Sequence, residues 1–314
     1  MNTFRNFIDG DFVDGSGEAF EDRFPTTGEV IAKVGHAGQD ALHDCMREYG
    51  GFEHNAQSLR VVDVLEDKYA AFAGLNLTFE TREGILKHCS AARARTLGDI
   101  GERFLKRHQP SLEAQLANLA DEIAYHNHDM DDGVRAGLLT LPQLRSVPLF
   151  ARHHDEVRAR YAQLTPRQER HETIRRIINT LVVDLNAHSR ARLDAAAPAS
   201  LDEVRHHAEP LIAFSPEIRA QTQAMRQFLF AHLYRHPQVH RVMSKAQRVI
   251  RELFGAFMDD PRLLPASDFA KVEQVEAADG LTGRARCVAD YIAGMTDRYA
   301  LDEHERLFDL RRLR

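Results

Sequence analysis

The stretch SLEAQLANLADEIAYHNHDMDDG, residues 111–133, has the periodicity of one long amphipathic helix. At about 100° per residue, its large apolar side chains gather on one side of the helix. These are Leu112, Leu116, Leu119, Ile123 and Met130. Ser111 is a suitable N-cap because its hydroxyl can accept a hydrogen bond from a backbone N–H of the first turn. We therefore expect a core-facing helix from Ser111 to about Gly133 or Gly137.

The opposite face of this helix carries Asp121, Tyr125 and Asp129, at about 0°, 40° and 80° on the same wheel. Three further polar residues fall near them: Asn118, His128 and Asp132. Polar residues occupy the solvent face of any amphipathic helix, so the pattern is typical of an ordinary surface. It equally permits a pocket in which a carboxylate binds a metal and an aromatic ring contacts a sugar or base. Helical spacing leaves both interpretations open.

Helical periodicity continues on both sides of this stretch. Leu59, Val62 and Leu65 are spaced for one face of a helix over residues 58–69. Further helices are expected over residues 167–188, 216–235, 237–258 and 282–298. Breaks are expected near residues 195–198 and at Asp260-Pro261. From residue 38 onward the chain is therefore predicted to be mainly α-helical.

Residues 4–34 have a different pattern. Asp9-Gly10 separates two short apolar segments, and an Asp-Gly pair favours the type I′ turn of a β-hairpin. A second turn is expected at residues 25–29, followed by a short strand at residues 30–32. We therefore predict a short N-terminal β-hairpin appendage over residues 1–34, followed by a helical domain over residues 35–314.

Composition limits the class of protein. The 314 residues carry a formal net charge of -6, which argues against a protein that coats nucleic acid electrostatically. No segment approaches the roughly 18 consecutive apolar residues of a membrane-spanning helix, and the N-terminus has no secretory pattern. Cys45, Cys89 and Cys287 are far apart, which favours a reducing compartment over a disulfide framework. We expect a cytoplasmic protein with no membrane partner.

Five blocks within residues 35–314 resemble, in the same order, the signature segments of the HD-domain deoxynucleoside-triphosphate (dNTP) triphosphohydrolases, the dGTPase-like family. The blocks are GHAGQDAL at 35–42, GGFEHNAQSLR at 50–60, LNLT with REGILKH within 75–88, LADEIAY with HD and DG within 119–133, and VADYIAGMTD at 288–297. The resemblance implies an HD-type helical fold and the hydrolysis of a dNTP, such as dGTP, to a deoxynucleoside and inorganic triphosphate. It also implies a homo-oligomer.

The resemblance assigns roles to individual residues. His36 and His54 correspond to histidines placed for catalysis, and Asp121 corresponds to the last ligand of a divalent metal, Mn²⁺ or Mg²⁺. Tyr125 and Asp129 correspond to residues that contact the deoxyribose. The remaining pocket or phosphate contacts would come from Asn55, Gln57 and Lys87. These assignments are chemically consistent, because a triphosphate needs cationic or hydrogen-bonding partners and a metal stabilises charge on the leaving group.

Two features depart from the family pattern. The family's metal is held by two histidines and two aspartates, of which three precede the position of Gly35, and residues 1–34 contain no histidine. A single carboxylate, Asp121, holds a transition metal poorly where the site was built on imidazoles. Gln39 replaces an acidic partner of the catalytic histidine and cannot stabilise a charged imidazole as a carboxylate would. We therefore expect an incomplete HD domain with impaired turnover.

Residues 4–34 instead resemble the extreme N-terminus of an aldehyde dehydrogenase, through FRNFIDGDFV at 4–13 and FPTTGEVIAKV at 24–34. This suggests a truncated, chimeric chain joined near residues 34–36. Three hypotheses follow. The chain is an active hydrolase in which other histidines replace the missing ligands, an inactive relative that binds nucleotides or oligomerises, or a non-functional hybrid. The sequence leaves binding of nucleic acid open.

Overall fold

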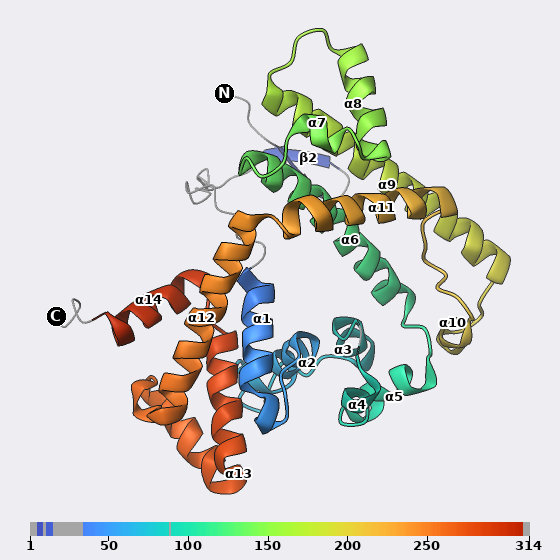
Figure 1. The fold of residues 1–314 in the computed structure, drawn as a ribbon. Coiled ribbons are helices and arrows are strands. Elements are labelled where there is room, and N and C mark those ends of the chain that lie inside the picture. The colour runs from blue at the N-terminus through green and yellow to red at the C-terminus, as the bar shows by residue number, and fades with distance from the viewer. Residues whose placement is uncertain (1–4, 9–10, 15–33, 88, 310–314) are drawn as a thin grey trace.

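The fold is described by a computed structural model over residues 5–8, 11–14, 34–87 and 89–309. Helices dominate it (Figure 1), and the prediction of a mainly α protein is confirmed. The helices are α1 Val34–Cys45, α2 His54–Arg60, α3 Phe79–Ile85, α4 Ala91–Ala94, α5 Gly98–Lys106, α6 Leu112–Arg135, α7 Leu141–Leu144, α8 Pro148–Arg160, α9 Pro166–Ala196, α10 Leu201–His206, α11 Pro216–Leu229, α12 Pro237–Asp259, α13 Ala266–Ala293 and α14 Asp297–Phe308. Short 3₁₀ or π segments join them: η2 Arg47–Tyr49, η3 Val61–Leu65, η4 Phe230–Tyr234 and η5 Pro261–Leu263.

Two short strands precede α1. β1 (Arg5–Ile8) pairs antiparallel with β2 (Asp11–Asp14), in a register that places Ile8 opposite Asp11. The predicted second turn and strand at residues 25–32 lie outside the described residues. The separate β appendage over residues 1–34 therefore stays a prediction.

Helix α6 begins as predicted. The Ser111 hydroxyl accepts a hydrogen bond from the Ala114 N–H at 3.3 Å, which caps the helix. The apolar stripe is largely buried, and Met130 is fully so. Leu116 was predicted to face the core but is half-exposed, because it lies at the margin of the apolar stripe. Asp129, predicted on the wet face, is buried instead.

The helices pack around two apolar cores. The first core joins α6, α7, α8, α9 and α11, and the second joins α1, α12, α13 and α14. Helix α12 belongs to both, because Val239 near its start lies in the first core and Phe257 near its end lies in the second. Figure 1 shows α12 running between the two groups of helices, with α1 packed along it. Burial of apolar side chains in both cores is the main force that holds this arrangement.

The helix predicted over residues 58–69 is wrong in its bounds. The structure starts α2 at His54 and ends the helical path at Leu65, after the π-turn segment η3. The chain then folds back, so that the Leu75 N–H donates to the Val62 carbonyl at 2.7 Å and the Gly74 N–H to the Glu66 carbonyl at 3.0 Å. These bonds satisfy carbonyls at the helix end, which is why the helix stops there although its apolar period continues.

Later boundaries follow the sequence more closely. Helix α9 runs past the predicted end at residue 188 and stops at Ala196, within the break predicted at residues 195–198, and α12 ends at Asp259, directly before the predicted break at Asp260-Pro261. The helix predicted over residues 282–298 corresponds to the second part of α13, because the non-helical backbone of Gly280 (φ 62°) divides α13 into two helical parts, and it ends at Ala293. The side chain of Thr296 caps the separate helix α14 by accepting from the Tyr299 N–H. Among the described residues, no helix combines the length and apolarity that crossing a bilayer requires.

Gly74→Ala should destabilise the fold. Gly74 has φ 68°, and a Cβ there would lie 2.4 Å from the backbone of Asp63, so the return of the chain over η3 must shift. We expect a loss of more than about 1 kcal/mol in the free energy of unfolding, measured by urea denaturation. The control is Gly255→Ala in α12, where a Cβ meets no atom within 4 Å. It should be neutral or stabilising, and equal losses in both variants would contradict the argument.

Candidate functional site

An ion pair joins two of the residues that the sequence singled out. Lys87 follows α3, and its Nζ donates to Oδ2 of Asp121 on α6 at 2.7 Å, although 34 positions separate them. Both side chains are partly exposed, with 37% and 60% of their surfaces accessible. An ion pair in contact with water contributes little to stability. Either side chain can therefore leave this ion pair and bind an external ligand at a low cost in free energy.

Tyr125 and Asp129 continue the same face of α6 toward η4. The Tyr125 ring is about 38% exposed, and partial burial raises the pKa of its phenol. The Asp129 carboxylate is buried and accepts a hydrogen bond from the Tyr234 hydroxyl of η4. Burial, and then this carboxylate, raise the pKa of Tyr234, so that the phenol stays a donor. Tyr234 is a positioning residue that sequence analysis missed, because it lies 105 positions away.

His126 also escaped the sequence analysis. It is 1% exposed, and its ring packs against the Tyr125 ring at a centroid distance of 4.2 Å. Neither ring nitrogen has a hydrogen-bond partner within the described part of the chain. Burial lowers the pKa of His126, because the charged form loses its hydration. A neutral imidazole therefore supports Tyr125 from inside the protein.

His54 and Asn55 begin helix α2. Glu53 caps the helix by accepting from the backbone N–H groups of Asn55 and Ala56, at 3.2 and 3.0 Å. The same carboxylate lies 3.4 Å from Nδ1 of His54. Asn55 is buried. The backbone at His36 belongs to α1, and its side chain lies outside the described residues.

Gln57 is engaged elsewhere. Its Nε2 donates to Oδ1 of Asp290 on α13 at 2.8 Å, and Arg60 makes a two-pronged contact with the same carboxylate. Gln57 therefore ties α2 to α13 in this structure, rather than pointing to the Lys87–Asp121 pair. The carboxylate of Asp290 is 10% exposed, so these partners keep a nearly buried charge satisfied.

A cleft of about 440 Å³ opens beside Lys87. One wall is apolar, with Leu119, Ile212 and Phe214 among its residues. Polar and charged side chains line other parts of it, with Arg103 and Arg219 among the basic ones. A cavity of this size, apolar on one side with a few charged groups, is typical of a small-molecule site.

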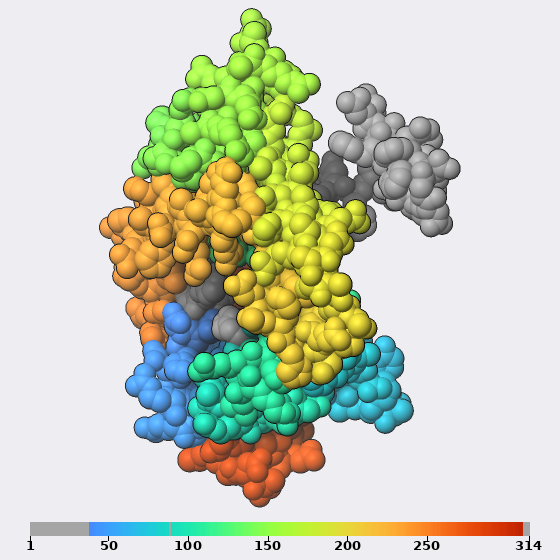
Figure 2. Space-filling model, turned by 90° about the vertical axis from the view of Figure 1, so that its right-hand side faces the viewer, coloured from blue at the N-terminus to red at the C-terminus, as the bar shows by residue number. Residues whose placement is uncertain are grey.

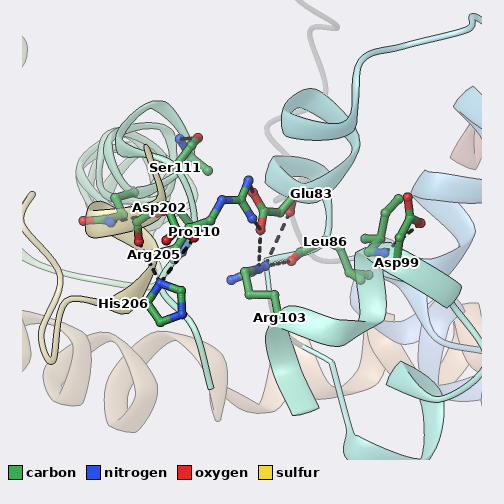
Figure 3. A network of polar contacts seen from close by, with 12 residues as sticks. Glu83, Leu86, Asp99, Arg103, Pro110, Ser111, Asp202, Arg205 and His206 are labelled. Atoms are coloured by element: carbon green, nitrogen blue, oxygen red, sulfur yellow. Dashed lines mark hydrogen bonds and ion pairs between the residues drawn. The ribbon is translucent and has the colours of Figure 1, made fainter. Parts of the chain in front are cut away.

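A buried charge network forms the floor of this region (Figure 3). Glu83 of α3 is fully buried, and Arg205 of α10 donates hydrogen bonds to both of its carboxylate oxygens at 2.9 and 3.0 Å. Arg103 of α5 lies 3.2 Å from the same carboxylate and donates to the Leu86 carbonyl at 2.7 Å. Figure 2 shows the segment around α10, in yellow, lying directly against the teal region of α4 and α5. The network therefore fixes the backbone immediately before Lys87.

The described residues do not fit a divalent metal at Asp121. No group of three or more His, Cys, Asp or Glu side chains comes together within the part of the chain that the structure describes. The ammonium of Lys87 stands against the Asp121 carboxylate at 2.7 Å, where a cation would bind. A metal at this carboxylate would have to displace Lys87.

Sequence comparison relates the chain to known proteins. Residues 212–306 match the model of the phosphohydrolase-associated domain. The chain is similar to the deoxyguanosinetriphosphate triphosphohydrolase-like protein of Bordetella pertussis, with 61% identity over 280 residues that cover 88% of this chain and 71% of the relative. Relatives with the same name from Ralstonia nicotianae and Nitrosomonas europaea are 59% and 54% identical, over 87% of this chain and 68% and 71% of their own lengths.

Glu83→Ala should lower the free energy of unfolding more than the removal of any surface carboxylate. Removing the shared carboxylate leaves the guanidinium groups of Arg103 and Arg205 poorly hydrated and unpaired, which costs about 3–5 kcal/mol. The measurement is the free energy of unfolding in urea. Glu102→Ala on α5 is the control, since its pair with Lys106 is more than half exposed and should change stability by less than about 1 kcal/mol. Similar losses in both variants would contradict a buried triad.

His126 should make stability depend on pH. Its folded pKa lies below the ordinary value of 6.5, so the unfolded chain binds the proton more tightly. The free energy of unfolding should therefore fall as pH drops below about 6.5 toward the folded pKa. His126→Leu should flatten this fall in urea titrations between pH 5 and pH 8. His171→Gln, at an exposed position on α9, should keep the wild-type slope, and an unchanged slope in His126→Leu would refute the assignment.

Proposed function

The chain belongs to the deoxyguanosinetriphosphate triphosphohydrolase-like family, and on that premise we propose that it binds a dNTP on the Asp121–Asp129 face of α6. The reaction is the hydrolysis of that dNTP to a deoxynucleoside and inorganic triphosphate. We further propose that turnover by this chain is impaired. The pairing of Lys87 with Asp121 is the observation that carries the proposal.

Lys87 supplies the positive charge for the phosphates. Its resting partner, Asp121, is exposed enough to water for the pair to open, and a triphosphate offers several anionic oxygens in exchange. Lys87 also borders the 440 Å³ cleft, so the charge lies where a bound nucleotide has room. The buried network of Glu83 with Arg103 and Arg205 holds the backbone in place during this exchange.

Tyr125 and Asp129 contact the deoxyribose in this proposal. The half-exposed Tyr125 ring offers an apolar face to the sugar. Asp129 accepts a hydrogen bond from a sugar hydroxyl through the oxygen that Tyr234 does not occupy. His36 and His54 act near the phosphates, and the Glu53 carboxylate lies beside Nδ1 of His54. Asn55 is a further pocket residue at the start of α2.

Impaired turnover follows from the ligand chemistry of Asp121. Family-like hydrolysis uses a divalent metal, Mn²⁺ or Mg²⁺, and such a site needs several imidazole and carboxylate ligands. Asp121 is already paired with Lys87. The second candidate function is therefore an inactive relative that binds nucleotides as a homo-oligomer. Lys87 favours this candidate, because it can bind phosphate without any metal.

We expect dNTPs to stabilise the protein while triphosphate release stays slow. A ligand that binds only the folded state raises the melting temperature, so each dNTP is tested by thermal denaturation and by assays of triphosphate release with Mn²⁺ or Mg²⁺. Lys87→Gln should weaken dNTP binding by about tenfold, the effect of losing one charge-assisted hydrogen bond. Lys106→Gln, which removes an exposed lysine of α5, should leave binding unchanged.

The outcomes separate the hypotheses. If no dNTP raises the melting temperature, the hypothesis of nucleotide binding is wrong and the hypothesis of a non-functional hybrid remains. Fast, metal-dependent release of triphosphate that disappears in Asp121→Ala would overturn the proposed impairment, because other groups would then complete the metal site. The metal content of the purified protein, measured with the same samples, distinguishes weak binding of metal from slow chemistry.

A further inference from the structure

A second cavity lies between α8 and α9, in the helix pair at the top of Figure 1 and far from α3 and α5. Its volume is about 380 Å³. Six polar side chains line it: Arg152, His153 and Glu156 of α8, and Arg176, Asn179 and Thr180 of α9. The spacing places each set on one face of its helix, so the two faces meet across the cavity. The proposed dNTP site uses none of these residues.

His153 organises the α8 side of the cavity. It is 5% exposed, and its Nδ1 lies 2.9 Å from Oε2 of Glu156. Its Nε2 lies 3.3 Å from Nη2 of Arg152 and 3.0 Å from Oγ1 of Thr180. Because a guanidinium group only donates, Nε2 is the acceptor and Nδ1–H donates to Glu156. The single carboxylate that lines the cavity is thus bound to the imidazole of His153 rather than to an arginine.

The two arginines keep their charges available. Within the described part of the chain, no carboxylate lies within ion-pair distance of Arg152 or Arg176. Nε of Arg176 is buried and has no hydrogen-bond partner there. The neighbouring Arg175 is different, since it binds Glu172 at 2.6 and 2.7 Å and is 72% exposed. A buried donor without an acceptor favours a ligand that brings one.

We propose that this cavity binds the phosphoryl groups of a small polyphosphate, either free or attached to a nucleoside. Guanidinium groups from two helices line the cavity, which suits an oxyanion with several oxygens. Asn179 adds an amide donor on the same wall. The volume exceeds what one carboxylate needs and accommodates a chain of phosphates. Such a site would let a polyphosphate bind away from the α6 face.

The test is isothermal titration calorimetry with inorganic triphosphate, carried out in the Lys87→Gln background, in which binding at the proposed α6 site is weakened. Arg176→Gln and Arg152→Gln should each raise the Kd for triphosphate at least tenfold. Arg175→Gln, the adjacent exposed arginine, should change it less than twofold. Arg176→Lys keeps the charge but loses the fork, so an intermediate Kd is expected.

Four results would overturn the proposal. One is an unchanged Kd in both Arg152→Gln and Arg176→Gln with melting temperatures that show folded protein. Another is an equal loss in Arg175→Gln, which would mean a general charge effect. The third is binding of an oligothymidylate but of neither triphosphate nor dGTP. Stronger binding of dGTP than of triphosphate would identify the nucleoside as part of the ligand and support the proposal. Loss of triphosphate binding in Lys87→Gln alone would place the only anion site on α6.

Discussion

The buried carboxylate of Glu83 is the constraint on which the candidate site depends. It has no contact with water, so its charge is stable only while Arg103 and Arg205 both face it. Arg103 also donates to the carbonyl of Leu86, which fixes the residue immediately before Lys87. The ammonium of Lys87 thereby reaches Asp121. Helices α3, α5 and α10 are each too short to be stable alone, and this one buried charge fixes their positions relative to one another.

Helix α6 provides the rigid surface against which these short helices are placed. Its apolar stripe lies in the first core, while its polar face meets Lys87 near the middle and Tyr234 near the end. Helix α2 is anchored separately, since Gln57 and Arg60 bind Asp290 in α13, next to the second core. Residues distant in sequence therefore reach the candidate site region through polar contacts, whereas the two cores position the helices that carry them.

The sequence predicts what depends on local chemistry. The span and cap of α6 follow from apolar period and from Ser111, and the break at Asp260 follows from the proline after it. Local pattern does not predict the exposure of Leu116 or the burial of Asp129 and His126, because each depends on which helix packs opposite. The end of η3 depends on a loop that returns at Gly74. Lys87 and Asp121 could be related only through family resemblance, and nothing local marks Glu83, Arg103 and Arg205 as partners.

Ion pairs of the same chemistry have opposite consequences in this fold, and burial decides which. The pair of Lys87 with Asp121 is hydrated, so the folding free energy changes little when Lys87 leaves Asp121 and binds a phosphate instead. The contacts of Glu83 are shielded, so no external anion can compete for Arg103 or Arg205 without unfolding α3. Ligand binding at Lys87 thus has little effect on stability, although only three residues lie between Lys87 and Glu83 along the chain. The Lys87–Asp121 pair can therefore separate to bind a ligand while the buried contacts of Glu83 stay intact.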